Sequence, residues 1–221
     1  MSPQAIESRL AVADLTVSTR LNRSAEEQYL MVLCHGAGAG LEHAHMTALA
    51  SALNQCGVST LRINFPYMEL GKRRTDNLDT CLATIGAAMK KLDEIDTTLP
   101  RILGGHSFGG RMASHFAANE TSDVQGLIYF SFPLHPAKKP AIKRAEHLSR
   151  VQPPQLFLSG DRDDLADKLL LNQVIASLTN AEVHWLDTAN HSYQTLKRSR
   201  TRVDTVYDEI CTHITTWLAL I

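Results

Sequence analysis

Short apolar runs rich in β-branched residues recur along the chain, and each has the length and composition of a buried β-strand. These runs are Tyr29–His35, Val58–Asn64, Arg101–His106, Val124–Phe130, Gln155–Ser159 and Glu182–Leu186. Near the N-terminus, Ala11–Thr19 alternates apolar and polar residues, which predicts one edge strand. The chain is therefore expected to contain a sheet whose central strands are buried on both faces.

Between these runs, apolar residues recur three and four positions apart, as in amphipathic helices. The predicted helices are His43–Cys56, Asn77–Ile95, Phe108–Ala118, Lys168–Leu178 and Thr201–Leu220. The last carries one apolar stripe that includes Val203, Val206 and Ile210. Alternation of strands and helices predicts a mostly parallel sheet with helices on both faces. Residues 1–221 are expected to form a single domain, because the proline-rich segment 132–140 is too short for a lid.

Composition and charge limit the partners that the chain is expected to have. The formal net charge is −1, so no global field attracts nucleic acid or a membrane surface. No run approaches the ~18–20 apolar residues that span a bilayer, and the N-terminus lacks the features of a secretory signal. The cysteines at positions 34, 56, 81 and 211 are far apart, without metal-ligand spacing, and indicate no disulfide framework. A cytoplasmic protein is expected, with its oligomeric state left open.

The strongest chemical signal is Gly105-His106-Ser107-Phe108-Gly109, which matches the pattern G-x-S-x-G. A predicted strand precedes it and a helical segment rich in small residues follows it. A nucleophile elbow requires this order, because a sharp strand-to-helix turn exposes the serine side chain. The helix N-terminus also directs backbone N–H groups toward developing oxyanion charge. Ser107 is therefore the candidate nucleophile; the alternative is a glycine-rich strand-to-helix turn that binds a ligand or nothing.

A serine nucleophile needs a base and an acid, which follow it in that fold in the order Ser, acid, His. His191 lies in a loop after the last predicted strand and is the favoured base, whereas His184 alternates with apolar residues inside that strand. The acid should follow the preceding strand, where Asp161, Asp163 and Asp164 are all candidates. The turn spacing favours Asp163, and each of the three can instead be a turn or cap residue.

An oxyanion hole needs two N–H donors, and the backbone N–H of Phe108, directly after the nucleophile, supplies the first. The second should come from the glycine-rich loop after an early strand, where Ala37 is the candidate. The spacing of this loop fits neither of the common phosphate-binding glycine motifs, so a nucleotide site is not favoured.

Five segments together resemble a known family: HGAGAG, GGHSFGGRMAS, SFPLHP, FLSGDRDD and ANHS. In this order they are similar to the small lidless α/β hydrolases related to dienelactone hydrolase. The closest similarity is to a subgroup that contains the testis-expressed hydrolase-like protein and a hydrolase-like subunit of the non-specific-lethal chromatin complex. The resemblance covers about residues 29–221. It implies the α/β-hydrolase fold without a large lid domain, and a triad of Ser107, an aspartate in residues 160–164 and His191. It implies no metal and no cofactor.

Basic residues gather in three loops that are expected to lie at one edge of the sheet. They are Lys72, Arg73, Arg74, Lys138, Lys139, Lys143, Arg144, Lys197, Arg198, Arg200 and Arg202, half of the 22 Lys and Arg. We predict a positive rim that attracts an anionic or carboxylate-bearing substrate, or an acidic partner surface, with Arg73 and Arg74 as candidate binding residues. The alternative is that acids such as Glu69, Asp76, Glu146 and Asp204 pair with them.

Two further residues are candidates for substrate binding. Arg111 lies one helical turn after the nucleophile, although an ion pair with a nearby acid is the favoured interpretation. His135 can line the pocket or be an ordinary loop residue, and Tyr67 and Phe132 are candidate apolar pocket walls. The sequence thus predicts a serine hydrolase that cleaves an ester, thioester or amide of a small molecule. The alternatives are a non-catalytic partner-binding module and a serine peptidase.

Overall fold

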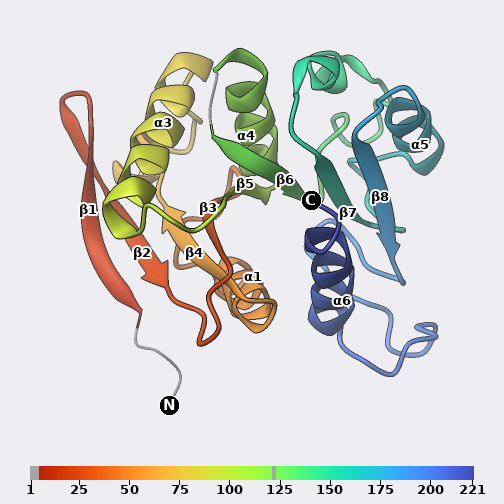
Figure 1. Cartoon of the computed structure of the whole chain (residues 1–221). Coiled ribbons are helices and arrows are strands. Elements are labelled where there is room, and N and C mark those ends of the chain that lie inside the picture. The colour runs from red at the N-terminus through yellow and green to blue at the C-terminus, as the bar shows by residue number, and fades with distance from the viewer. Residues whose placement is uncertain (1–4, 121–122) are drawn as a thin grey trace.

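A computed structural model describes residues 5–120 and 123–221 (Figure 1). Its strands form one eight-stranded sheet in the order β1-β2-β4-β3-β5-β6-β7-β8. The strands are β1 (Ile6–Val12), β2 (Leu15–Asn22), β3 (Tyr29–Cys34), β4 (Val58–Ile63), β5 (Arg101–His106), β6 (Val124–Phe130), β7 (Gln155–Gly160) and β8 (Ala181–Leu186). Strands β3 to β8 run parallel to one another, whereas β2 pairs antiparallel with β4, so the predicted mostly parallel sheet is confirmed.

The single edge strand predicted at Ala11–Thr19 is wrong, because this segment contains a chain reversal. Strands β1 and β2 form an antiparallel hairpin in which Val12 pairs with Leu15. Ala13, in the two-residue turn, has a φ of 48°, a conformation typical of hairpin turns. The alternation of apolar and polar residues continues across such a turn, so the pattern alone does not reveal it.

Helices cover both faces of the sheet (Figure 1). The helices are α1 (Ala44–Gln55), α2 (Pro66–Glu69), α3 (Leu78–Ile95), α4 (Phe108–Asn119), α5 (Lys168–Ala176) and α6 (Val206–Leu218). Helices α1 and α6 pack on one face, and α3, α4 and α5 pack on the other, each over its own apolar core. Helix α6 starts later than predicted, since Thr205 and Asp208 form a capping box and Val203 is fully exposed.

The connection from β6 to β7, which is described throughout, contains only two short 3₁₀ turns, η1 (Lys143–Ala145) and η2 (Leu148–Arg150). No large lid therefore interrupts the alternation of strands and helices at this point. Among the helices of the described ranges, none combines the length and the apolar character needed to cross a bilayer.

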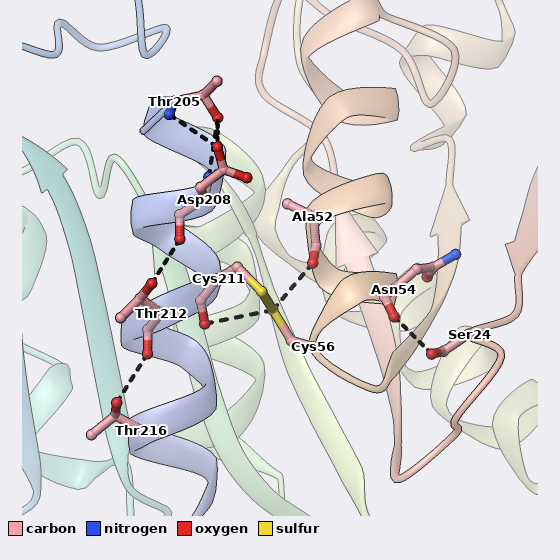
Figure 2. Close-up of a disulfide and its surroundings, with 9 residues drawn as sticks. All are labelled: Ser24, Ala52, Asn54, Cys56, Thr205, Asp208, Cys211, Thr212 and Thr216. Carbon is pink, nitrogen blue, oxygen red and sulfur yellow. Dashed lines mark hydrogen bonds between the residues drawn. A yellow bond between two sulfur atoms is a disulfide. The ribbon is translucent and has the colours of Figure 1, made fainter. Parts of the chain in front are cut away.

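The expectation that the chain has no disulfide is wrong. Cys56, directly after α1, is joined to Cys211 of α6, and their Cα atoms lie 5.9 Å apart (Figure 2). The two residues are separated by 155 positions in the sequence and meet because α1 and α6 pack side by side on one face. Cys34 and Cys81 are buried free thiols. Disulfides persist mainly in oxidising compartments, so a cytoplasmic location stays a prediction.

Candidate active site

Ser107 lies in the sharp turn between β5 and α4. Its backbone has φ 51° and ψ −116°, a conformation that a non-glycine residue adopts only when its surroundings enforce it. Here the Ser107 N–H donates to the Phe130 carbonyl at 2.9 Å, and the Ser107 carbonyl accepts from the Arg111 N–H at 3.1 Å. The Ser107 side chain makes no capping hydrogen bond to the helix. The predicted strand–turn–helix context is thus present, with the hydroxyl free for other partners.

Two glycines of the motif allow this turn to lie directly against the end of β3. A Cβ atom on Gly105 would come within 2.3 Å of the Cys34 carbonyl oxygen, and one on Gly109 within 2.4 Å of the same oxygen. These contacts are with backbone atoms, which cannot move aside as a flexible side chain could. The glycines are therefore required by the close approach of β5 and α4 to β3.

The structure brings Ser107, His191 and Asp163 together, although they come from turns after three different strands. His191 Nε2 lies 2.8 Å from Ser107 Oγ, and His191 Nδ1 lies 2.8 and 2.9 Å from the two carboxylate oxygens of Asp163. The Asp163 side chain is completely buried, and its Oδ1 also accepts from the Leu165 N–H at 2.8 Å. With its Nδ1 proton donated to Asp163, the imidazole can accept the Ser107 proton at Nε2.

The other candidates for base and acid lie elsewhere. The His184 ring stacks on His213, with centroids 4.1 Å apart, and contacts Glu182 on the same strand. Asp161 and Asp164 are exposed, whereas Asp163 turns inward under His191. Sequence spacing alone did not separate these three aspartates.

The glycine-rich loop after β3 is held by two buried side chains. The Tyr67 hydroxyl donates to the Ala37 carbonyl at 2.9 Å, and His35 Nδ1 donates to the Gly36 carbonyl at 2.8 Å. In the described parts of the chain, the N–H groups of Ala37 and Phe108 have no hydrogen-bond acceptor. A free pair of such donors is what an oxyanion requires.

Tyr67 and Phe132 do not form pocket walls, because both side chains are fully buried. The Tyr67 ring packs edge-on against Phe108, and its hydroxyl reaches the Ala37 loop instead. Sequence reasoning missed the roles of Tyr67 and His35 in holding this loop. The only available signal was their polar atoms in otherwise apolar surroundings, since buried polar groups need partners.

His106 was also missed as a contributor to the site. Its Nε2 donates to the main-chain carbonyl of His191 at 3.0 Å, and its ring lies close to that of His45, with centroids 4.4 Å apart. Burial lowers the pKa of His106 to about 3, so its imidazole is neutral at physiological pH. The neutral ring therefore holds the loop that carries His191.

Some arginines of the predicted basic rim form ion pairs that stabilise the fold, and others have no ion-pair partner in the described ranges. Arg200 pairs with Glu209 at 2.9 Å, and Arg202 pairs with Asp204, so these two arginines stabilise the start of α6. Arg73 and Arg74 are exposed between α2 and α3, and neither has an ion-pair partner in the described ranges. Their role in substrate binding stays a prediction.

His135 is not free to bind a substrate as its sequence position suggested. The residue is buried; its Nδ1 donates to the Pro136 carbonyl at 3.0 Å and its Nε2 accepts from the Asp167 N–H at 2.9 Å. Both ring nitrogens therefore have partners, and the bond of Nε2 connects the loop after β6 to the segment before α5. As for metals, the described residues contain no group of three or more His, Cys, Asp or Glu side chains arranged to hold an ion.

Comparisons with known proteins agree with this architecture. Residues 27–219 match the model of a family described as "Alpha/beta hydrolase domain". Dienelactone hydrolase from Anabaena variabilis has a similar structure, with a TM-score of 0.79 and 17% identity, covering 99% of this chain and 98% of that one. A serine hydrolase without lid from Xanthomonas campestris has a TM-score of 0.76 and 20% identity, covering 98% of this chain and 96% of that one. Est1E from Butyrivibrio proteoclasticus has a TM-score of 0.74 and 16% identity, covering 96% of this chain and 97% of that one. The chain belongs to the α/β hydrolase domain family.

Proposed function

We propose that this α/β hydrolase is a serine hydrolase that transfers an acyl group from an ester or thioester to water. The observation that carries the proposal is the contact of His191 with Ser107 on one ring nitrogen and with Asp163 on the other, at 2.8 Å each. Neither contact would be needed by a protein that used this fold only to bind a partner.

In the first half of the reaction, Ser107 Oγ attacks the substrate carbonyl while His191 Nε2 accepts the hydroxyl proton. Asp163 holds the imidazole in the required tautomer and stabilises the imidazolium, without taking the proton itself. The N–H groups of Ala37 and Phe108 stabilise the oxyanion. His191 then gives its proton to the leaving alcohol or thiol, and an acyl-enzyme remains.

In the second half, His191 takes a proton from water, and the resulting hydroxide attacks the acyl-enzyme carbonyl. Return of that proton to Ser107 releases the acid and restores the free enzyme. The short β6–β7 connection supports small or flexible substrates, because its two 3₁₀ turns add no lid domain at the site. It offers no domain that measures the length of a peptide, which favours esters and thioesters over peptides. The motifs quoted above support placement in the subgroup of testis-expressed and non-specific-lethal-complex hydrolase-like proteins.

Labelling with a neutral fluorophosphonate probe tests the proposal. We expect the wild type to be labelled at Ser107, and Ser107→Ala and His191→Ala to lose labelling. Asp163→Asn should lower the rate of ester hydrolysis by about 10⁴-fold, the scale seen when a triad acid becomes an amide. Matched controls are Ser192→Ala and His184→Ala, which remove the same residue types outside the contact.

A folded wild-type protein that resists the probe would contradict the proposal and favour a partner-binding module. Equal loss of activity in Asp161→Asn, Asp164→Asn and Asp163→Asn would contradict the role given to Asp163. Circular dichroism of each variant separates loss of chemistry from loss of fold.

A further inference from the structure

Arg111 is the residue of α4 one turn after Ser107, and its backbone N–H donates to the Ser107 carbonyl. The guanidinium is partly buried, and its Nε atom is shielded from solvent without any hydrogen-bond acceptor. Among the described residues, no carboxylate lies within ion-pair distance of it, so the expected ion pair of Arg111 is wrong. Residues 1–4 and 121–122 contain no Asp or Glu that could supply one.

A second guanidinium, that of Arg144 in η1, is close enough for its charge to act on the first. Arg144 Nη1 donates to the Pro133 carbonyl at 3.4 Å. Burial lowers the pKa of Arg111, and the positive charge of Arg144 lowers it further. Because like charges that are partly removed from water repel one another, this pair is unfavourable without an anion between or beside them.

The other titratable neighbours of Arg111 do not supply that anion. Burial raises the pKa of the Cys81 thiol to about 12, so the thiol is protonated. Burial also lowers the pKa of His115 to about 4, so its ring is neutral near pH 7. The surroundings therefore contain two positive charges and no compensating negative charge from the side chains that face Arg111.

Both arginines, like Ser107, belong to segments that follow the carboxyl ends of central strands: Arg111 is on α4, after β5, and Arg144 is on η1, after β6. Side chains of a helix tilt toward its N-terminus, so Arg111 covers the turn of α4 that begins at Ser107. Pro133, which Arg144 contacts, lies in the segment just after β6, at the carboxyl edge of the sheet. Ser107 and Arg111 are only one helical turn apart, about 5.4 Å along the axis of α4, so a substrate that reaches both needs only a short chain between its scissile carbonyl and its carboxylate.

We propose that Arg111 and Arg144 bind the carboxylate of an anionic ester or thioester whose scissile carbonyl lies at Ser107. This inference rests on the proposed function and names its substrate class. Guanidinium groups match a carboxylate geometrically, since they donate two parallel hydrogen bonds to its oxygens. The preferred substrates are half-esters and half-thioesters of short dicarboxylic acids.

The test compares two ethyl esters of similar shape that differ in charge. Monoethyl succinate carries a free carboxylate, and ethyl levulinate carries a neutral acetyl group in its place. We expect the wild type to show a kcat/KM for the anionic ester at least tenfold above that for the neutral one. Arg111→Gln and Arg144→Gln should each lower this ratio at least tenfold, mainly through a higher KM for monoethyl succinate. Lys143→Gln, next to Arg144 but exposed, is the matched control and should keep the ratio.

A binding measurement that does not depend on turnover accompanies the kinetics. Free succinate should slow fluorophosphonate labelling of Ser107 in the wild type, and this protection should weaken in both arginine variants. A wild type that is labelled but shows no preference for the anionic ester, or variants that keep the wild-type ratio, would overturn the substrate class alone. A folded wild type that is not labelled would overturn the proposed function itself, so the two failures are distinguishable.

Discussion

At the scale of single residues, buried polar side chains hold the loops on which the reacting groups lie. Tyr67 and His35 hold the loop of Ala37, and His106 holds the backbone of His191. None of the three is expected to touch the reacting atoms. Each fixes a main-chain carbonyl, and so orients the peptide groups or the imidazole that the proposed chemistry uses.

Removal of the Tyr67 hydroxyl tests whether the position of the Ala37 loop matters for the proposed chemistry. Tyr67→Phe removes the 2.9 Å hydrogen bond to the Ala37 carbonyl and leaves the ring packing intact. We expect kcat to fall about threefold to tenfold with little change in KM, because one hydrogen bond contributes about 0.5–1.5 kcal/mol. Steady-state hydrolysis of a neutral ester gives both parameters.

The control for this substitution is Tyr29→Phe. The Tyr29 hydroxyl also donates to a backbone carbonyl, that of Leu218 at 3.0 Å, but at the opposite end of the strand from the site. Its removal should lower stability slightly and leave kcat unchanged. Equal losses of kcat in the two variants would show that Tyr67 has no specific role in the loop.

Buried neutral histidines make the stability of the fold depend on pH. Burial lowers the pKa of His35 to about 4 and that of His106 to about 3, below the value of about 6.5 in an unfolded chain. Between these values the unfolded state binds more protons than the folded state. The stabilisation is therefore complete above pH 6.5 and is lost as pH falls toward 4 and 3.

From pH 7.5 to pH 5.0, each of these histidines should lower the free energy of unfolding by roughly 2 kcal/mol. Urea unfolding at both pH values measures the loss. His35 Nε2 accepts from the Phe65 N–H at 3.1 Å, and its protonation would remove this bond. In His35→Gln, the decrease in the free energy of unfolding between the two pH values should be smaller than in the wild type by about the contribution of one histidine. A variant with the full wild-type decrease would contradict the role given to His35.

At the scale of elements, the site depends on how closely α4 approaches the end of β3. Gly109→Ala places a Cβ atom 2.4 Å from the Cys34 carbonyl oxygen and 2.6 Å from that of His35. We expect a loss of about 3 kcal/mol or more in the free energy of unfolding, because backbone atoms cannot move aside. Thermal and urea unfolding measure it.

Gly38→Ala is the matched substitution in the neighbouring loop. A Cβ atom on Gly38 meets no heavy atom within 4 Å, so this variant should be nearly as stable as the wild type. If both variants had the same stability, the close approach of α4 to β3 in this structure would be incorrect.

At the scale of the whole molecule, the proposed site lies at the carboxyl ends of the parallel strands and the disulfide lies toward their amino ends. Ser107 follows the carboxyl end of β5, whereas Cys56 lies just before the amino end of β4 and is joined to α6. The disulfide connects the first and last helices on one face (Figures 1 and 2). It therefore restrains the chain as a whole without touching the reacting groups.

Reduction of the disulfide should lower the free energy of unfolding by about 2–4 kcal/mol, because the unfolded chain regains the freedom of a long closed loop. Fluorophosphonate labelling of Ser107 should persist at temperatures where the protein stays folded. Melting with and without reductant, with thiol alkylation to verify reduction, measures the effect. The double variant Cys56→Ser/Cys211→Ser should melt at one temperature in both conditions; a wild type whose melting is unchanged after full reduction would contradict the prediction.

The sequence by itself determined the alternating architecture and the positions of the central strands. It did so because a buried strand and a helix with one buried face each impose a characteristic spacing of apolar residues. This spacing is visible in the sequence of the element itself, without knowledge of what packs against it. The same holds for the turn at Ser107, since a strand, small residues and a helix follow one another directly there. The loop of His191 was identifiable from its place after the last strand.

Only the tertiary structure decided features that depend on contacts between distant segments. It placed Asp163, and neither Asp161 nor Asp164, beside His191, and it joined Cys56 to Cys211. It also left Arg111 without a carboxylate and gave Tyr67 a partner in the Ala37 loop. The physical reason is that hydrogen bonds and ion pairs act over a few ångströms in space, and the folded path of the chain sets which residues come within that range.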